Sequence, residues 1–202
     1  QARDELREMG YASTVEYLAE CCRLVMEETG LLPHANPGVV SDDEMLLLRG
    51  VCASQGLMLE SLSERLMEPG MPHHGSPDKV PQRRLEALER AGRLKVPFTT
   101  GILIGIGETR QERIDALLAI REAQDKYGHV QECIVQPFRA KSDTPMRDTP
   151  DLSHEELIWT ITAAACILGP SGVCVQTPPN LSELHFLPSL LEAGVCDLGG
   201  IS

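Results

Sequence analysis

The sequence predicts an α/β protein built on a parallel sheet. Segments with helical periodicity alternate along the chain with short apolar segments that glycine or proline bounds. Several of the short segments are apolar at successive positions, which is typical of strands buried on both faces. About six such strand and helix units fit either an open doubly wound sheet or a partial (β/α)8 TIM-type barrel.

Four of the expected helices begin with the same capping pattern. A Ser or Thr is followed three residues later by Glu, so that the hydroxyl accepts from a backbone N–H and the carboxylate reaches back. These pairs are Ser13 with Glu16, Ser41 with Glu44, Thr109 with Glu112, and Ser153 with Glu156. Two more helices are expected at PQRRLEALERAG and LPSLLEAG, and helix ends are expected at Gly30, Gly92, Gly128 and Gly194.

The expected strands lie between these helices. They fall within residues 31–40, 56–61, 96–105, 129–138, 172–179 and 195–202. The longest irregular piece, residues 68–80, is a candidate lid. In both candidate architectures ligands bind at the carboxyl ends of the strands, so the chemistry is expected there.

The composition restricts the partners. The chain has 202 residues, 42% hydrophobic and 24% charged, which predicts one globular domain over residues 1–202. A net charge of −12 argues against nucleic acid or an anionic membrane, and there is no apolar run of about 18 residues. We expect a small-molecule ligand and a cytoplasmic location, since no secretory leader is visible.

The stretch FTTGILIGIGETRQER (98–113) places three glycines in and just after a buried strand. One interpretation is that Gly101, Gly105 and Gly107 leave the backbone bare for a flat, nucleotide-like ligand beside a helix start. The alternative is a tight connection from strand to helix. A dinucleotide fingerprint is excluded, because its glycines need offsets of two and five residues.

Polar residues at other strand ends are candidate ligand contacts, each with a structural alternative. Glu60 and Ser61 suit ribose hydroxyls or an ammonium group, but could instead start a helix. Gln136 and Arg139 suit a heterocycle or a carboxylate, although Arg139 fits a surface charge equally well. The remaining candidates are Arg84, otherwise a solvated arginine, and Asn36 and Asn180, otherwise turn formers.

The cysteines and histidines predict no metal site in this sequence. The seven cysteines are scattered without metal-ligand spacing, so we interpret them as reduced thiols, with Cys22, Cys166 and Cys174 as small core residues. His73 and His74 are interpreted as a mobile loop pair.

At these residues the sequence resembles a known family. GILIGIGE is similar to the GxIxGxxE motif of radical S-adenosylmethionine (SAM) enzymes, with Leu103 in the Ile position. Together with YASTVEYL, GLLPHANPGVVS, ASQGLMLESLSERL, YGHVQECIVQPFRAK and PPNL, it resembles the radical SAM subunit or domain of the 7,8-didemethyl-8-hydroxy-5-deazariboflavin (FO) synthases. The resemblance extends over nearly the whole chain and implies a (β/α)8 or near-complete barrel.

The resemblance implies roles for individual residues. The SAM contacts it implies are Glu60, Ser61, Arg84, Thr100, Gly101, Gly105 and Glu108, and the substrate contacts are Asn36, Gln136, Arg139 and Asn180. The family's [4Fe-4S] cluster is held by a C-x3-C-x2-C loop that this sequence lacks. We therefore expect the cluster ligands upstream of Gln1, and the chain to be the larger C-terminal part of a barrel truncated at both ends.

The activity implied by the resemblance is radical chemistry. SAM is cleaved at the cluster, and the 5'-deoxyadenosyl radical abstracts hydrogen from a tyrosine adduct of 5-amino-6-ribitylaminouracil, which cyclises to FO with loss of ammonia. The implied partner is a second radical SAM subunit or fused domain. Alternatives are the partner that makes the adduct, a biotin-synthase-like or menaquinone-pathway enzyme, or a non-catalytic nucleotide-binding barrel. The fragment alone is expected to be inactive.

Overall fold

The computed structural model describes residues 3–181 and 184–199 and contains one five-stranded sheet in that part of the chain. Its strands are β1 (His34–Ala35), β2 (Ser54–Gly56), β3 (Phe98–Ile104), β4 (Val130–Pro137) and β5 (Cys174–Gln176). All pairings are parallel, and the spatial order follows the chain order. Without a reversal of strand order there is no doubly wound sheet, so the partial barrel is confirmed.

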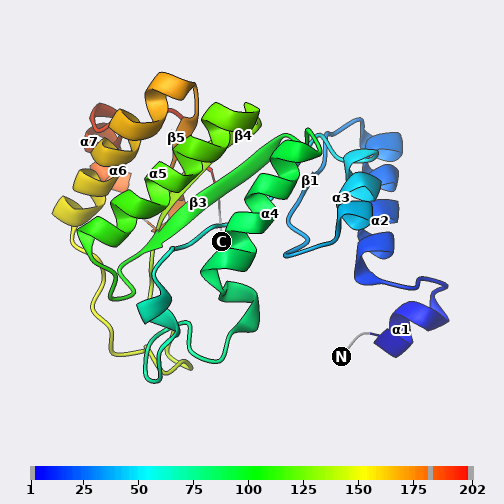
Figure 1. Ribbon diagram of the computed structural model, residues 1–202, viewed down its shortest axis with the longest axis horizontal. Coiled ribbons are helices and arrows are strands. Elements are labelled where there is room, and N and C mark those ends of the chain that lie inside the picture. The colour runs from blue at the N-terminus through cyan, green and yellow to red at the C-terminus, as the bar shows by residue number, and fades with distance from the viewer. Residues whose placement is uncertain (1–2, 182–183, 200–202) are drawn as a thin grey trace.

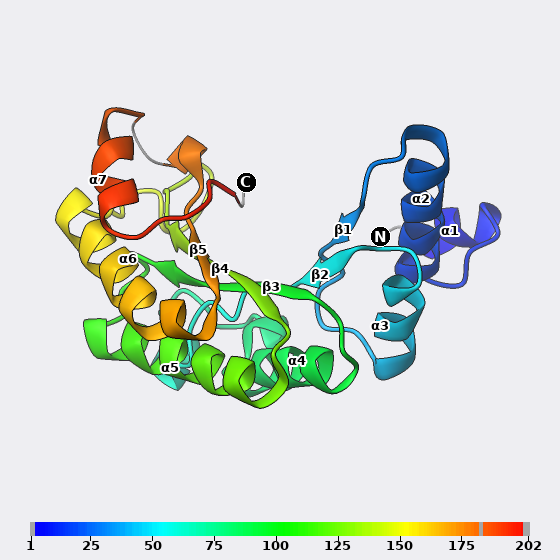
Figure 2. The same cartoon turned by 90° about the horizontal axis from the view of Figure 1, so that it is seen from above.

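The helices lie on the outer, convex side of the sheet, which curves as an open arc (Figures 1 and 2). They are α1 (Arg3–Glu8), α2 (Thr14–Thr29), α3 (Asp42–Arg49), α4 (Pro81–Arg93), α5 (Arg110–Tyr127), α6 (His154–Leu168) and α7 (Leu187–Glu192). The core lies between α4, α5, α6 and the strands, and includes Ile102, Ile104, Leu117, Ile120 and Val135. None of the described helices is long and apolar enough to cross a membrane.

All four predicted helix starts are confirmed, but only two have the full reciprocal cap. Ser41 and Thr109 form complete capping boxes with their glutamates. Ser13 accepts from the backbone of Glu16, whose carboxylate instead accepts from the N–H of Ala12. At Ser153 the predicted return contact is also wrong, because arginines of α5 take the Glu156 carboxylate.

Of the four predicted helix ends, those at Gly30 and Gly128 agree and that at Gly92 does not, while α7 ends at Glu192, two residues before Gly194. α2 and α5 end at Gly30 and Gly128, both in the left-handed conformation. Gly92 is inside α4, which continues to Arg93, so the predicted end there is wrong. A side chain at Gly92 would meet the ring of Tyr127 at 2.5 Å, so this glycine serves the close packing of α4 on α5.

Several strands are shorter or earlier than predicted. The strand expected at 56–61 is β2, which already ends at Gly56, and Glu60 makes only an isolated bridge to Ile102. Of the segment 195–202, the described part makes one parallel bridge, between Gln176 and Asp197. The apolar pattern correctly predicts which segments are buried. Extended chain can be buried without pairing in a sheet, so the pattern overestimates the length of the strands.

The strand register decides which side chains face the concave side of the sheet, here called the lumen. Thr99 pairs with Glu132, and Glu132 pairs with Cys174; Gly101 pairs with Ile134, and Ile134 with Gln176. Paired residues of parallel strands point to the same face, and the two rows are separated by two residues. Both rows therefore face the lumen.

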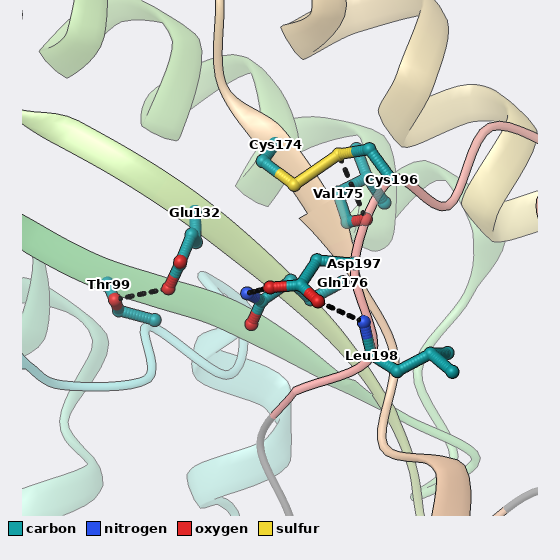
Figure 3. Close-up of a disulfide and its surroundings, with 8 residues drawn as sticks. All are labelled: Thr99, Glu132, Cys174, Val175, Gln176, Cys196, Asp197 and Leu198. Atoms are coloured by element: carbon teal, nitrogen blue, oxygen red, sulfur yellow. Dashed lines mark hydrogen bonds between the residues drawn. A yellow bond between two sulfur atoms is a disulfide. The ribbon is translucent and has the colours of Figure 1, made fainter.

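The interpretation of all seven cysteines as reduced is wrong for two of them. Cys174 and Cys196 form a disulfide (Figure 3), with their Cα atoms 5.9 Å apart. The bridge between Gln176 and Asp197 brings these chain segments side by side, within the range that a disulfide spans. Cys166 is exposed on α6, so its assignment to the core is also wrong.

Candidate functional site

Glu60 lies beyond β2 in a conformation that few residues adopt. Its φ is +62°, in the left-handed region, although it is not glycine. Hydrogen bonds to β3 hold it there, because its N–H donates to the carbonyl of Gly101 and its carbonyl accepts from Leu103 N–H. Such strain costs on the order of 1–3 kcal/mol and is concentrated at functional sites.

Three cationic or basic side chains surround the Glu60 carboxylate. Nζ of Lys79 lies 3.0 and 2.8 Å from its two oxygens, and Nη1 of Arg84 lies 3.0 Å from Oε1. Nε2 of His73 lies 3.1 Å from Oε2. We call Glu60, His73, Lys79 and Arg84 the rim site, because they lie at the carboxyl end of the strands.

The rim site keeps Glu60 ionised. Burial alone would raise the pKa of this carboxyl, but the contacts with His73, Lys79 and Arg84 outweigh burial and hold the pKa at about 2. At neutral pH the rim therefore presents an anion beside fixed cations.

Arg84 points inward, as predicted, with its side chain only 7% exposed. Arg84 lies in the first turn of α4, and its guanidinium also donates to the carbonyl oxygens of Asp78 and Met58. These contacts tie the loop 68–80 to the end of the second strand unit, so the guanidinium is fixed before any ligand arrives.

A cavity of about 520 Å³ opens along the lumen next to the rim site. It brings together four of the predicted contacts, Asn36, Glu60, Arg84 and Gln136. Its volume is that of a small-molecule site. Its lining also includes four residues that the sequence argument missed, namely His34, Thr99, Glu132 and Gln176.

The packing and backbone conformation of the chain itself explain the three glycines of the stretch 98–113. A Cβ at Gly101 would lie 2.2 Å from the carbonyl oxygen of Ile134 and 2.7 Å from the terminal methyl of Met58. Gly105 and Gly107 have φ of +92° and +98°, which favours glycine. Close packing of β3 on β4 accounts for Gly101, and the tight connection accounts for Gly105 and Gly107. Contact of Gly101 and Gly105 with adenine stays a prediction.

Glu108 is used to build the turn after β3. Its carboxylate accepts from the N–H groups of Gly105 and Ile106 at 2.8 Å and from Nε of Arg113 at 2.8 Å. Arg113 also bonds Glu156 and Thr160 of α6. The side chain of Glu108 is therefore oriented into the protein, and its predicted contact with a ligand has no support from this geometry.

Two other predicted contacts point away from the lumen. The hydroxyl of Thr100 is fully buried and accepts from Leu59 N–H, while the preceding residue, Thr99, faces the cavity. Successive side chains of a strand point to opposite faces, so only one of these threonines can face a ligand. The prediction from sequence named Thr100, and the structure has Thr99. Ser61 is buried and accepts from Ser63 N–H, so it shapes the turn.

Arg139 and Asn180 do not line the lumen cavity. Arg139 is exposed and pairs with Asp151 in the loop before α6. Asn180 is exposed in the short 3-10 helix Pro179–Leu181. Their predicted contact with substrate requires an arrangement that this structure does not contain.

The missed residues differ in how they could have been found. Thr99, Glu132 and Gln176 follow from strand alternation once the register is known. His73 and Lys79 come from the loop 68–80, and the interpretation of His73 as part of a mobile loop is wrong, since its side chain is 4% exposed. No spacing in the sequence links that loop to Glu60.

In the described residues, no three His, Cys, Asp or Glu side chains are grouped so that they could hold a metal ion. The rim offers a paired anion and cation, and the lumen offers neutral and acidic hydrogen-bond acceptors.

The fold is that of a partial (β/α)8 barrel, and solved enzymes share it. The chain matches methylornithine synthase (PylB) with a TM-score of 0.74 over 92% of this chain and 52% of that one, at 19% identity. It matches HydG, a maturase of the [FeFe]-hydrogenase, with a TM-score of 0.76 over 93% of this chain and 43% of that one, at 16% identity. At these identities the likeness shows the fold.

The sequence relatives are the FO synthases, and the chain is homologous to them over its entire length. It is 52% identical to 7,8-didemethyl-8-hydroxy-5-deazariboflavin synthase of Methanopyrus kandleri and 53% identical to FO synthase of Nocardia farcinica. FO synthase of Mycobacterium tuberculosis is 51% identical. The resemblance indicated by the motifs is confirmed. No protein-family model matches the chain.

The chain spans only part of these relatives. It covers 60% of the Methanopyrus protein, 23% of the Nocardia protein and 24% of the Mycobacterium protein. The activity of the relatives therefore enters the next subsection as a proposal for the protein that contains this segment.

Proposed function

We propose that this chain is the larger part of the barrel that forms FO in a radical SAM enzyme. The observation that carries the proposal is 52% identity, over every residue of the chain, to a deazariboflavin synthase. The reaction is closure of the deazaflavin ring from a tyrosine adduct of 5-amino-6-ribitylaminouracil, with loss of ammonia. Residues 1–202 would form one structural unit of that enzyme.

The rim site fits the polar groups of S-adenosylmethionine. An amino-acid carboxylate suits the fixed guanidinium of Arg84, and ribose hydroxyls or an ammonium group suit the ionised carboxylate of Glu60. In the free chain Lys79 contacts both oxygens of Glu60, and its side chain is 30% exposed. We infer that Lys79 moves aside when a ligand takes its place.

When bound, S-adenosylmethionine and a [4Fe-4S] cluster supply the radical that abstracts hydrogen from the substrate. The described residues do not fit a cluster, so its ligands would come from another part of the protein. What this chain contributes is placement: the rim orients the cofactor, and the lumen holds the substrate and keeps out water.

The test uses the full-length protein, reconstituted with iron and sulfide without oxygen. With S-adenosylmethionine, a reductant and the adduct, we expect 5'-deoxyadenosine, ammonia and fluorescent FO in equal amounts. A reconstituted protein that cleaves S-adenosylmethionine but forms no FO would instead belong to another radical SAM reaction, and one that takes up no iron would refute the proposal.

The role of the rim has its own readout, the affinity for S-adenosylmethionine measured by calorimetry. Glu60→Gln removes the anion and is expected to weaken binding roughly 10-fold to 100-fold, as hydrogen bonds to a charged group do. Glu64→Gln is the matched control, because Glu64 is exposed nearby and outside the cavity. Equal affinities of the two variants would contradict the assignment.

A further inference from the structure

Glu132 is a lumen carboxylate that the proposed chemistry does not yet use. It lies near the start of β4, half-buried, and lines the cavity. Gln136 lies four residues further along the same strand, about 13 Å toward the rim at roughly 3.3 Å per residue. Glu132 therefore lies at the amino-end floor of the lumen, away from the rim site.

The partners of Glu132 are unusually few for a carboxylate in a cavity. Thr99 on β3 donates its hydroxyl to Oε2 at 2.9 Å (Figure 3). Within residues 3–181 and 184–199, no Lys, Arg or His forms an ion pair with it, whereas Glu60 has three such neighbours. A half-buried carboxylate with one neutral partner can still accept several hydrogen bonds.

The neighbouring strand adds an amide to the same cavity. Nε2 of Gln176 donates one of its two N–H groups to Asp197 at 3.0 Å. The other side of that amide is its carbonyl oxygen, and Gln176 lines the same cavity as Glu132. Figure 3 shows both side chains extending from adjacent strands β4 and β5. We call Thr99, Glu132 and Gln176 the floor site.

We propose that the floor site recognises a primary amine of the substrate, with Glu132 as the acceptor that selects it. The inference rests on the proposed function and deepens it. In that function the substrate derives from 5-amino-6-ribitylaminouracil, and the N–H groups of its 5-amino substituent complement an acceptor-rich floor. The carboxylate holds the amine, and Thr99 positions the carboxylate.

The test compares two ligands on the full-length protein by calorimetry: the tyrosine adduct of 5-amino-6-ribitylaminouracil, and the analogue of that adduct in which hydrogen replaces the 5-amino group. Wild type is expected to prefer the amino compound roughly 10-fold to 100-fold, the size of hydrogen bonds to a charged acceptor. In Glu132→Gln that preference should shrink to a few-fold. In Glu122→Gln, an exposed change on α5, it should match wild type.

Each other outcome overturns the inference. It fails if wild type does not distinguish the two compounds or binds neither, or if Glu132→Gln retains the full preference. If that variant does not fold, Glu132→Asp replaces it, since it keeps the charge but withdraws the carboxylate. Affinity for S-adenosylmethionine and its cleavage are measured on the same samples, so failure of the proposed function is seen separately.

Discussion

The rim site and the floor site each have one glutamate in the same cavity, but the surroundings of the two carboxylates are opposite. Glu60 is enclosed by Arg84, Lys79 and His73, and its side chain is 12% exposed. Glu132 is half-buried, and the described residues give it one hydroxyl neighbour. The negative charge of Glu60 is already compensated by cations of the protein, whereas the charge of Glu132 has no cation partner among the described residues.

This difference teaches how to separate stability from recognition. Removing a carboxylate that compensates a buried guanidinium leaves an unpaired charge, which is strongly destabilising. Removing a carboxylate without a cation partner removes little from the folded chain. Glu60→Gln and Glu132→Gln are the same chemical change, so the difference between their effects on the full-length protein measures the difference between the two environments.

The largest effect is expected for Glu60→Gln. Because Arg84 is 7% exposed and keeps only the more distant and exposed carboxylate of Asp78 at 3.6 Å, the free energy of unfolding should fall by about 3 kcal/mol or more. Glu132→Gln, the matched change, should lower it by less than about 1 kcal/mol. Urea unfolding followed by circular dichroism measures both. Similar losses in the two variants would remove the distinction between rim and floor.

Acid unfolding sharpens the same comparison. The pKa of Glu60 is about 2 in the folded chain and near 4.5 when unperturbed, so its contribution is complete above pH 4.5 and is lost as pH falls toward 2. A difference of this size corresponds to roughly 3 kcal/mol. Unfolding free energies across this pH window should fall more steeply for wild type and Glu132→Gln than for Glu60→Gln. Parallel curves would show that the rim does not hold Glu60 ionised.

Gly101 connects the two regions, because it lies between them on β3. Gly101→Ala places a methyl 2.2 Å from the Ile134 carbonyl oxygen and should cost about 2–3 kcal/mol by separating β3 from β4. The control is Gly169→Ala, where φ is −52° and no atom lies within 4 Å, so the change should be within about 0.5 kcal/mol. If Gly101→Ala is equally neutral, the strands tolerate adjustment, and the glycine needs a ligand as its reason.

The disulfide joins β5, the strand next to Glu132, to the segment that contains Asp197, and its contribution to stability can be measured. Reduction of the unfolded protein should release two additional thiols, and these should be absent in Cys196→Ser, since Cys174 and Cys196 are paired. Cys196→Ser should lower the free energy of unfolding by about 2 kcal/mol under oxidising conditions, because a loop closed by 22 residues is released. Cys166→Ser, at an exposed free thiol, is the control. An equal number of thiols with and without reductant would show that the pair does not form.

The smallest effect is expected for Thr99→Val, which removes the hydroxyl that donates to Glu132. Glu132 is half-buried, so water can replace the lost donor, and unfolding should change by only about 1 kcal/mol. Preference for the amino ligand should fall less than in Glu132→Gln, because the carboxylate remains. A loss of stability as large as that of Glu60→Gln would place the floor in the structural framework of the barrel.

Much of the fold was predictable because it depends on local chemistry. The hydroxyls of Ser13, Ser41, Thr109 and Ser153 cap helices through contacts within four residues, so the sequence marks those starts directly. Continuous apolar runs also predict parallel strands, because both faces of such strands are buried. Arg84 was predicted as a ligand contact or a solvated arginine, and its 7% exposure rules out the solvated alternative.

The errors arise where distant segments meet. Thr99 and Thr100 are indistinguishable in sequence, and only the register with β4 turns Thr99 toward the cavity. His73 and Lys79 reach Glu60 because the loop 68–80 folds back over the strand ends, a path that no local pattern encodes.

The sequence by itself determined a parallel α/β barrel segment of the FO synthase type, because helix caps, apolar periodicity and long shared strings are properties of neighbouring residues. Only the tertiary structure decided which carboxylate is neutralised and which stays available. That outcome depends on the distances of Glu60 and Glu132 from groups far away in the chain, and charge interactions in a partly buried site depend on such distances.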